Sequence, residues 1–488
     1  MSMVAAGLDI GGSSIKAWVA NTDGHIISQV SAPTPVRDSH DGQFDFDPPE
    51  LWSLLCQTLS RALVQAGPSH GKIAGVTVSS LRQGFVLVGD DGELGNGYYN
   101  RNRAGESQLD FLEDTVGREE LYAITGHWLA PELTLPKILH IQKSDPVRWG
   151  QCRKVLFLHD WVIWKLSGEF VSEVSLICAG QMANVSARTW AHDMLGKLQI
   201  PGAILPPAVE AGTIAGGVTQ TAADRIDGLE AGTPVVVGGS DSQMVSLGMG
   251  GMSPGVATVV AGSSTPIQLT TSSPVVDPAR RPWLSTHLEK DRWVIEGNAG
   301  YPGTMSEWWN SVSGSLPSLT RPNAPTSPEL VSLVAFPLWE ENHWRNRFPP
   351  SIKGFSMTTT PEDIAESILE SHAFSIRSNL EMLESVSGKP ATRVLLGGGA
   401  ADVLSTFLPD VLGRSIEVVQ SQSESALAGV TLVGRALGIP THATPDIRSV
   451  SPQKARNYDS GYAAFIEAYL TEFSAHTHRR ASEELENQ

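Results

Sequence analysis

The sequence predicts an α/β protein of two similar domains, each with a mixed β-sheet, and three observations lead to this prediction. The chain has 488 residues, which is more than one hydrophobic core usually serves. Its first part reads as three strands, a helix and a fourth strand, an order typical of α/β layers. The same order of elements returns after the middle of the chain.

In the first half, a three-stranded meander precedes an amphipathic helix and a buried strand. The turn "TDG" at 22–24 favours a hairpin between the second and third strands. Prolines at the start and a glycine at the end delimit the helix. The expected strands cover 4–10, 15–21, 25–31 and 73–80, and the expected helix covers 48–67.

The second half repeats this pattern, although not its letters. A glycine-rich segment at 235–251 separates the two halves, as a hinge would require. The two domains should therefore face one cleft. The repeated strands are expected at 254–262, 266–271, 292–297 and 393–399, and the long helix at 360–383.

Composition excludes several classes of protein. The chain is 41% hydrophobic and 18% charged, which is typical of a globular fold. A formal net charge of -17 disfavours nucleic acid or an anionic membrane as partner. Three widely spaced cysteines support neither disulfides nor a CxxC metal site. Because the N-terminus lacks a basic, then apolar leader and no long apolar run follows, we expect a cytoplasmic protein.

The segment "LDIGGSSIK" combines a carboxylate with a turn suited to anions. The backbone N–H groups and hydroxyls of Gly11, Gly12, Ser13 and Ser14 could receive a phosphate that Lys16 neutralises. Asp9 would repel this phosphate unless a metal ion lay between them. A plain hairpin turn is the alternative interpretation. A second hydroxyl-rich turn comprises Gly262, Ser263 and Ser264.

Two further segments follow buried strands at the carboxyl end, where α/β sheets usually place ligands. Asp241 in "GGSDSQ" could serve in catalysis or cap the helix that follows. Gly398, Gly399 and Ala400 could let an aromatic ring lie against the backbone, although tight strand-to-helix packing explains them nearly as well.

The ordered set of motifs over residues 4 to 440 resembles the FGGY family of carbohydrate kinases. The resemblance implies two ribonuclease H-like, actin-like ATPase domains with ATP and a sugar meeting in the cleft. It implies that Asp9 holds Mg²⁺, that both turns receive phosphates, that Asp241 is the catalytic base, and that 398–400 bind adenosine. The motifs are "LDIGGSSIK", "LTLPKILHIQK", "GGSDSQMVSLGMG", "VVAGSSTP", "GFSMTTTPEDIAESILE", "LLGGGAADVL" and "ESALAGVTLVGRALG".

The sugar end departs from the family pattern. By resemblance, Arg82 and Gln83 in "SSLRQG" are sugar contacts, although Arg82 could instead form a surface ion pair. In "GYYNRNRAG", Arg101 stands where the family usually has an aspartate that binds sugar hydroxyls, and Asn102 follows it. We expect Arg101 and Asn102 to contact the substrate. These departures leave the identity of the sugar open.

We therefore expect an ATP- and Mg²⁺-dependent kinase that phosphorylates a sugar hydroxyl, with D-xylulose as the leading substrate. An autoinducer kinase, or another polyol or sugar-acid kinase, is the alternative, and a homodimer is left open. A catalytically inactive actin-like sugar sensor is the non-enzyme alternative. The expected divisions are a sugar- and phosphate-binding domain at 1–245, an adenosine-binding domain at 246–440, and a helix with a polar tail at 441–488.

Overall fold

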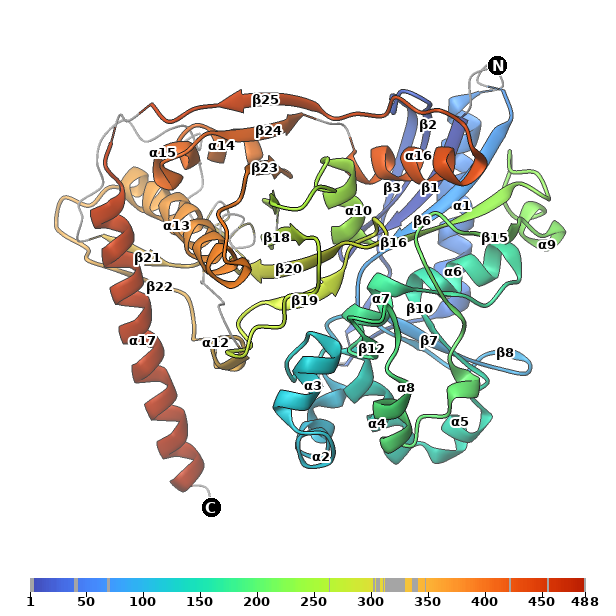
Figure 1. The fold of residues 1–488 in the computed structure, drawn as a ribbon, viewed down its shortest axis with the longest axis horizontal. Helices are drawn as coiled ribbons and strands as arrows, with labels where there is room; N and C mark the ends of the chain where they lie inside the picture. The colour runs from blue at the N-terminus through green and yellow to red at the C-terminus, as the bar shows by residue number, and fades with distance from the viewer. Residues whose placement is uncertain are drawn as a thin grey trace.

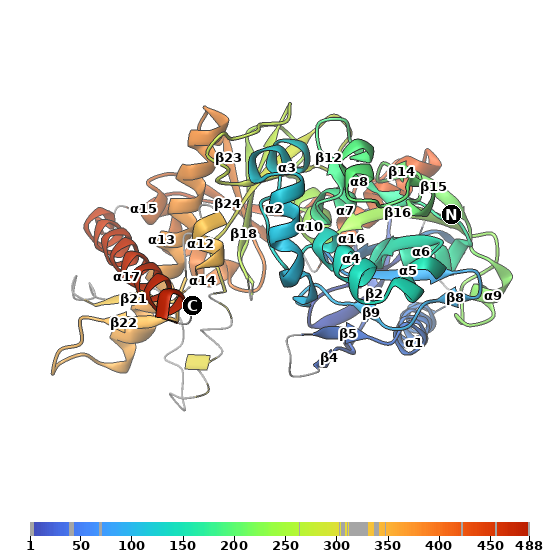
Figure 2. The ribbon, with the colours of Figure 1, turned by 90° about the horizontal axis from the view of Figure 1, so that it is seen from below.

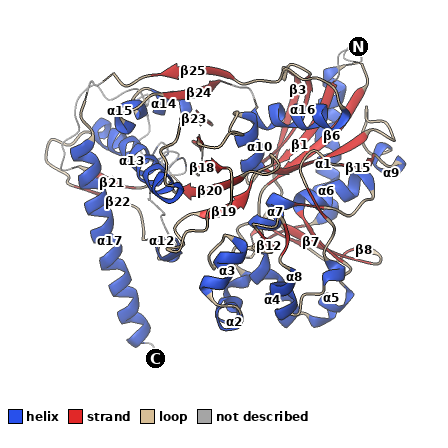
Figure 3. Cartoon of the chain, viewed as in Figure 1, coloured by secondary structure: helices blue, strands red, loops and turns tan. Residues whose placement is uncertain are grey.

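The computed structural model describes most of the chain as two lobes side by side. Figure 1 shows the N-terminal lobe in blue and green and the C-terminal lobe in yellow to red. Each lobe is built on a central sheet, and helices cover the strands (Figure 3). The described residues are 4–38, 43–67, 71–262, 264–301, 303, 308–309, 311, 330–335, 341–346, 348–420, 423–453 and 456–486.

The N-terminal sheet has the order β15-β16-β6-β1-β2-β3. Strand β1 pairs antiparallel with β2 and parallel with β6, so the sheet is mixed as predicted. Asp47 caps helix α1 (Pro48–Ala66) by accepting a hydrogen bond from Glu50 N–H, and Gly67 ends the helix. The strands are β1 (Val4–Ile10), β2 (Ser14–Asn21), β3 (Ile26–Pro33), β6 (Ile73–Ser80), β15 (Ile214–Gly217) and β16 (Pro234–Ser240).

The C-terminal sheet repeats this topology and confirms the predicted internal repeat. Its order is β19-β20-β18-β17-β23-β24-β25, with β17 antiparallel to β18 and parallel to β23. A capping box formed by Thr360 and Asp363 begins the long helix α13 (Pro361–Ser387). The strands are β17 (Val256–Val260), β18 (Pro266–Thr271), β19 (Trp283–Thr286), β20 (Trp293–Asn298), β23 (Arg393–Gly397), β24 (Ile416–Gln420) and β25 (Asp446–Val450).

Two helices lie where the lobes meet. Helix α10 (Asp241–Gly248) follows β16 directly, and α16 (Glu424–Leu437) returns from the C-terminal half to pack on the N-terminal sheet. A Cβ on Gly429 of α16 would lie 2.4 Å from the Trp18 ring, so this contact requires glycine. The domain divisions at residues 245 and 440 stay predictions.

A second N-terminal layer lies below the main sheet in Figure 1. Trp161 on α6 (Leu158–Ser167) is fully buried in the hydrophobic core of this lobe. The remaining N-terminal elements are β4 (Arg37–Asp38), β5 (Phe44–Phe46), β7 (Phe85–Gly89), β8 (Gly92–Glu93), β9 (Gly97–Tyr98), β10 (Lys154–Phe157), β11 (Ser172–Glu173), β12 (Ala183–Asn184), β13 (Thr189–Trp190), β14 (Ala208–Val209), 3₁₀ helices at Ala104–Gln108 and Gly202–Ile204, α2 (Leu109–Thr115), α3 (Arg118–Thr125), α4 (Thr134–Ser144), α5 (Pro146–Gln151), α6 (Leu158–Ser167), α7 (Val174–Ala179), α8 (His192–Lys197) and α9 (Gln220–Ala223).

The chain ends in a long helix, α17 (Asp459–Glu486), on the outer side of the C-terminal lobe (Figure 2). The predicted polar tail is thus helical as far as Glu486. Within the part of the chain that the structure describes, no helix has the length and hydrophobicity to cross a bilayer. The other C-terminal elements are β21 (Val331–Leu333), β22 (Ser351–Lys353), α12 (Glu341–Arg345), α14 (Ala401–Ser405) and α15 (Leu408–Leu412).

Candidate active site

A cleft of about 670 Å³ lies between the lobes and brings together residues that are far apart in the sequence. Asp9 and the turn 11–13 come from the N-terminal sheet, Asp241 begins α10, and Ser264 comes from the C-terminal lobe. The first predicted turn and Ser264 of the second therefore line one cleft, whereas Gly262 is not part of its lining. Ser263 lies outside the described residues.

The first turn is both a hairpin and part of this cleft. Gly11 N–H donates to Ser14 O over 3.0 Å, which closes the turn between β1 and β2. Gly11, Gly12 and Ser13 line the cleft, whereas Ser14 and Lys16 are not part of its lining. Lys16 pairs with Asp9 across the two strands, so its charge acts on that carboxylate from the side.

Asp9 is partly buried near the end of β1. Ser79 Oγ donates to Asp9 Oδ1 over 2.8 Å. Burial raises the pKa of Asp9, while Ser79 and Lys16 act in the opposite direction. A cation placed beside Asp9 would therefore stabilise its ionised form.

Asp241 is the first residue of α10 and faces the same cleft. The N-cap position belongs to Ser240, so the interpretation of Asp241 as the helix cap is wrong. Asp241 Oδ1 accepts a hydrogen bond from the adjacent Ser242 N–H over 2.7 Å. Among the described residues, this is the one hydrogen bond found for its carboxylate. Burial raises the pKa of Asp241 to about 6, the Arg82 cation lowers it, and the Asp9 carboxylate raises it.

A buried polar network holds the backbone that leads to Asp241. Gly238 N–H donates to His159 Nε2 over 3.2 Å. The proton of this imidazole is therefore on Nδ1, which donates to Asp160 Oδ1 over 2.8 Å. Both side chains are fully buried. Sequence reasoning missed this pair, although a histidine and an aspartate inside the apolar run "VLFLHDWVIW" are an unusual signal.

Asp9 fits a metal ion that arrives with a nucleotide. The described residues contain no group of three or more His, Cys, Asp or Glu side chains that could hold a metal by themselves. Mg²⁺ commonly takes one or two carboxylates together with phosphate oxygens and water. The carboxylate of Asp9, which lines the cleft beside the first turn, matches that donor set.

The second turn lies beside the glycines after β23. Ala400 N–H donates to Ala261 O over 3.0 Å, directly before Gly262. A Cβ on Gly398 would lie 2.6 Å from Ala261 O, so tight packing explains this glycine. At Gly399 a Cβ would meet nothing within 4 Å, which leaves backbone open to a ligand.

Arg82 forms a buried ion pair that joins the lobes. Its Nη1 and Nη2 atoms donate to the two carboxylate oxygens of Glu296 on β20, over 3.0 and 2.9 Å. Gln268 Nε2 donates to Glu296 Oε2 over 2.7 Å. The side chains of Arg82 and Glu296 are only 17% and 6% exposed, so the predicted alternative of a surface pair is wrong. Arg82 nevertheless lines the cleft, as does Gln83.

Lys137 ties together the two loops at the sugar end. Its fully buried Nζ donates to Gln83 O over 2.9 Å and to Tyr99 O over 3.1 Å. Burial lowers the pKa of Lys137 to about 7. Gln83 adopts a positive φ of 65°, and Thr134 Oγ1 also donates to its carbonyl. These contacts fix the loop that carries Arg82 and Gln83.

Of the residues near 101, the structure brings Arg101 and Asn100 into the cleft but not Asn102. The Arg101 guanidinium lies 4.6 Å from the Phe44 ring centre. Asn102 is buried and uses its side chain on the backbone, donating to Phe44 O and accepting from Ala104 N–H. Its side chain therefore shapes the loop, and its contact with the substrate stays a prediction.

Three tryptophans form an aromatic wall at this end. The Trp283 ring lies 5.5 Å from that of Trp128 and 5.8 Å from that of Trp344, and all three line the cleft. Trp344 comes from the segment "WEENHWRNRFPP", so this segment contributes a ring to the cleft.

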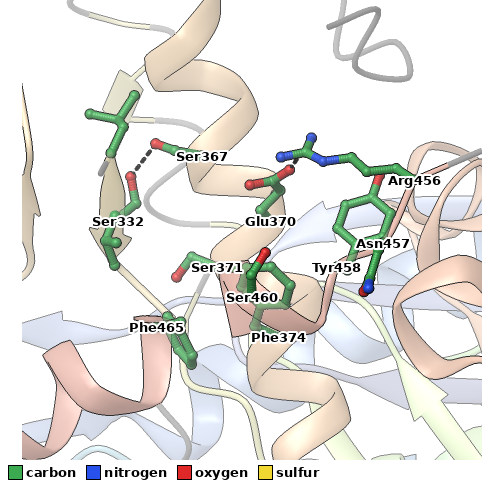
Figure 4. A pocket seen from close by; sticks show the side chains of 13 residues that line it. Ser332, Ser367, Glu370, Ser371, Phe374, Arg456, Asn457, Tyr458, Ser460 and Phe465 are labelled. Atoms are coloured by element: carbon green, nitrogen blue, oxygen red, sulfur yellow. Dashed lines mark hydrogen bonds and ion pairs between the residues drawn. The ribbon is translucent and has the colours of Figure 1, made fainter. Parts of the chain in front are cut away.

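A second cavity, of about 230 Å³, lies between α13, β21 and the start of α17 (Figure 4). Arg456 Nη1 lies 2.7 Å from Glu370 Oε1, and the hydroxyls of Ser332 and Ser367 bond each other, so its polar groups are engaged with one another. None of the predicted site residues lines it. We therefore place the candidate active site in the cleft between the lobes.

Comparisons with known proteins relate most of the chain to one family. Residues 4–248 match the N-terminal domain and residues 257–436 the C-terminal domain of the FGGY family of carbohydrate kinases. The autoinducer-2 kinases of Salmonella paratyphi A and Photorhabdus laumondii are 26% and 27% identical, over 88% of this chain and 86% of theirs.

Solved structures share the fold at low sequence identity. The xylulose kinase of Rhodospirillum rubrum has a TM-score of 0.87 and is 23% identical, covering 97% of this chain and 100% of that chain. The gluconate kinase of Lactobacillus acidophilus has a TM-score of 0.81 and is 18% identical, covering 99% and 98%. These similarities bear out the expected pair of actin-like domains.

Proposed function

Because the chain belongs to the FGGY family of carbohydrate kinases, we propose that it transfers the γ-phosphate of ATP to a hydroxyl of a small polyhydroxy ketone. The family acts on sugar hydroxyls, and the choice of substrate within it is our proposal. The observation that carries the proposal is the presence of Asp241, Asp9 and the first turn in one cleft that also holds a polar, aromatic sugar end.

D-Xylulose is the leading candidate substrate. A second candidate is the ligand of the autoinducer-2 kinases, which is favoured by their identity to this chain over most of its length. The family's usual aspartate at the sugar end is replaced by Arg101, which donates hydrogen bonds and cannot accept them. A carbonyl oxygen at that end of the substrate would satisfy Arg101.

In the proposed mechanism, Asp241 accepts the proton of the attacking hydroxyl. Phosphoryl transfer depends mainly on alignment and charge neutralisation, so a positioned base completes rather than drives the reaction. The His159–Asp160 pair holds the strand end that carries Asp241 in place. Arg82, held by Glu296, keeps a positive charge beside the base and favours its ionised form.

The phosphate side of the cleft is assigned to the two turns. Gly11, Gly12 and Ser13 would approach the phosphates from one lobe, and Ser264 from the other. Asp9 would hold Mg²⁺, which when bound neutralises the phosphate oxygens. The open backbone at Gly399 would receive adenosine, in line with the proposed nucleotide-binding role of residues 246–440.

The test is ADP release with purified protein, Mg²⁺ and ATP over a panel of ketoses, polyols, aldonates and the autoinducer-2 precursor. We expect release that depends on one group of hydroxy ketones and that is lost in Asp241→Asn. An inactive sensor would bind a sugar without ADP release, and the wild type and the Asp241→Asn variant would then behave alike. That result would refute the proposed activity.

A further inference from the structure

Glu132 lines the cleft, and one of its two carboxylate oxygens has no hydrogen-bond partner among the described residues. It lies two residues before α4, lines the cleft, and has a side chain that is 21% exposed. Its Oε1 atom accepts a hydrogen bond from Arg103 Nη1 over 2.8 Å. Its Oε2 atom is buried and has no hydrogen-bond partner among the described residues. A buried acceptor left without a donor is costly, so a ligand hydroxyl would be a favourable partner.

Arg103 holds this carboxylate without cancelling its charge. The same guanidinium also donates from Nε and Nη2 to Glu106 Oε2, over 3.2 and 3.1 Å. One cation is thus shared by two carboxylates, which leaves the group of Arg103, Glu106 and Glu132 with a net negative charge. Glu106 lines a neighbouring groove and is not part of the cleft lining.

The segment around Glu132 also shapes the proposed sugar site. Thr134 and Lys137, which follow it on α4, donate to the carbonyl of Gln83, and Lys137 also reaches Tyr99 O. Glu132 therefore belongs to the scaffold that fixes both loops at the sugar end. Its carboxylate can supply the acceptor that position 101 lacks.

The charges around the sugar end suit a neutral substrate with both kinds of hydrogen-bonding group. Arg101 offers donors to a carbonyl oxygen, while Glu132 accepts from a hydroxyl. Arg82 and Glu296 neutralise each other as an ion pair, so a carboxylate on the substrate would meet Glu132 and Asp241, with Arg101 as the remaining cation of the cleft lining. A cleft of this composition selects against sugar acids.

We propose that Glu132 binds a substrate hydroxyl and makes the enzyme selective for neutral hydroxy ketones over sugar acids. This inference rests on the proposed sugar-kinase function and goes further by naming the residue that sets the class of substrate. It separates this chain from sugar-acid kinases of the same fold, such as the gluconate kinase to which it is structurally similar.

The experiment compares Glu132→Gln with Glu106→Gln as the matched control, because both carboxylates bind Arg103 and only Glu132 lines the cleft. We measure kcat/KM for D-xylulose, the autoinducer-2 precursor and D-gluconate. Dissociation constants come from quenching of tryptophan fluorescence, since three tryptophans line the cleft. Unfolding temperatures show whether each variant folds.

Loss of a charged acceptor should lower kcat/KM for the preferred ketone by about 10- to 100-fold in Glu132→Gln, with a matching weakening of its binding. The ratio of gluconate to ketone activity should rise, and the KM for ATP should stay unchanged. Glu106→Gln should stay within about threefold of the wild type. Glu132→Asp keeps the charge but withdraws the carboxylate, so ketone activity should fall without a gain for gluconate.

Two results would overturn the inference while leaving the kinase function in place. One is a Glu132→Gln protein that matches Glu106→Gln on every sugar. The other is a wild type that prefers gluconate to all ketones. A wild type that neither binds nor phosphorylates any sugar of the panel would instead refute the proposed function, and the inference with it.

Discussion

Replacing Asp241 with asparagine tests the assignment of the catalytic base most directly. The amide keeps the shape of the side chain and can still accept the hydrogen bond from Ser242 N–H, but it cannot take up a proton. We expect kcat to fall by about 10²–10⁴-fold, the usual contribution of positioned proton transfer. Nucleotide binding should change little, since the turns and Gly399 stay intact.

The pH dependence of the activity gives a second, independent test of Asp241 as the base. Burial raises the pKa of Asp241 to about 6, so about 90% of it is ionised at pH 7 and about 10% at pH 5. Only the ionised form accepts a proton. Activity should therefore be lost as the pH falls through about 6, and kcat/KM should drop about tenfold between pH 7 and pH 5.

A variant of Arg82 tests the direction in which the acid limb of the activity moves. Its cation lowers the pKa of Asp241, so Arg82→Met should move the acid limb of kcat/KM to higher pH. The assay is a coupled measurement of ADP release between pH 5 and pH 8. Stability is checked at each pH, because Glu296 loses its cationic partner in this variant and keeps only Gln268 among the described residues. Two results would refute the assignment of Asp241 as the base. One is an Asp241→Asn protein whose kcat lies within threefold of the wild-type value. The other is an acid limb of kcat/KM that does not move in Arg82→Met.

Four further predictions follow from the same cleft. Excess chelator should abolish ATP turnover, and Asp9→Asn should lower kcat more than sugar binding; turnover that persists in chelator would contradict the role of Asp9. Sugar with a non-hydrolysable ATP analogue should reduce the radius of gyration in solution scattering, and an unchanged profile would argue against lobe closure. Gly399→Val should fold normally, because a Cβ there meets nothing within 4 Å, but it should raise the KM for ATP several-fold. Gly398→Val should instead lower the unfolding temperature. A Gly399→Val protein with the wild-type KM for ATP would show that Gly399 is not part of the adenosine site. Arg101→Asp should change the ranking of ketones and polyols by kcat/KM, and an unchanged ranking would mean that Arg101 does not face the substrate.

The repeated fold could be predicted because its signals are local. The turn at 22–24, the prolines that begin α1 and Gly67 at its end each fix structure within a few residues. Once the strands and helices are placed in order, the rules for mixed α/β layers leave few topologies. The two turns and Asp241 then fall at one cleft because both sheets present the ends of equivalent strands to it.

The missed features depend on contacts between distant segments. Arg82 and Glu296 are 214 residues apart, and nothing in either segment alone indicates a partner. Asn102 was assigned to the substrate from its place beside Arg101, but Phe44 O, 58 residues away, competes for its amide. The return of α16 to the N-terminal sheet likewise depends on the fit of Gly429 against Trp18.

The charge of the cleft explains why a carboxylate stands beside a turn suited to phosphate. Four carboxylates and two guanidinium groups line it, so these ionised side chains leave it with a net charge of about -2 at neutral pH. A triphosphate brought into this environment alone would be repelled, and Lys16 lies outside the lining. In the proposed function, a divalent cation held by Asp9 would reverse this balance on the phosphate side. Toward the proposed sugar site, Arg82 and Glu296 neutralise each other, while Asp241 and Glu132 outweigh Arg101. The charge that remains there is negative, which a neutral substrate would tolerate better than an anionic one. Charge would therefore separate the two ligands: the metal ion would admit the nucleotide, and the remaining carboxylates would favour a neutral hydroxyl compound.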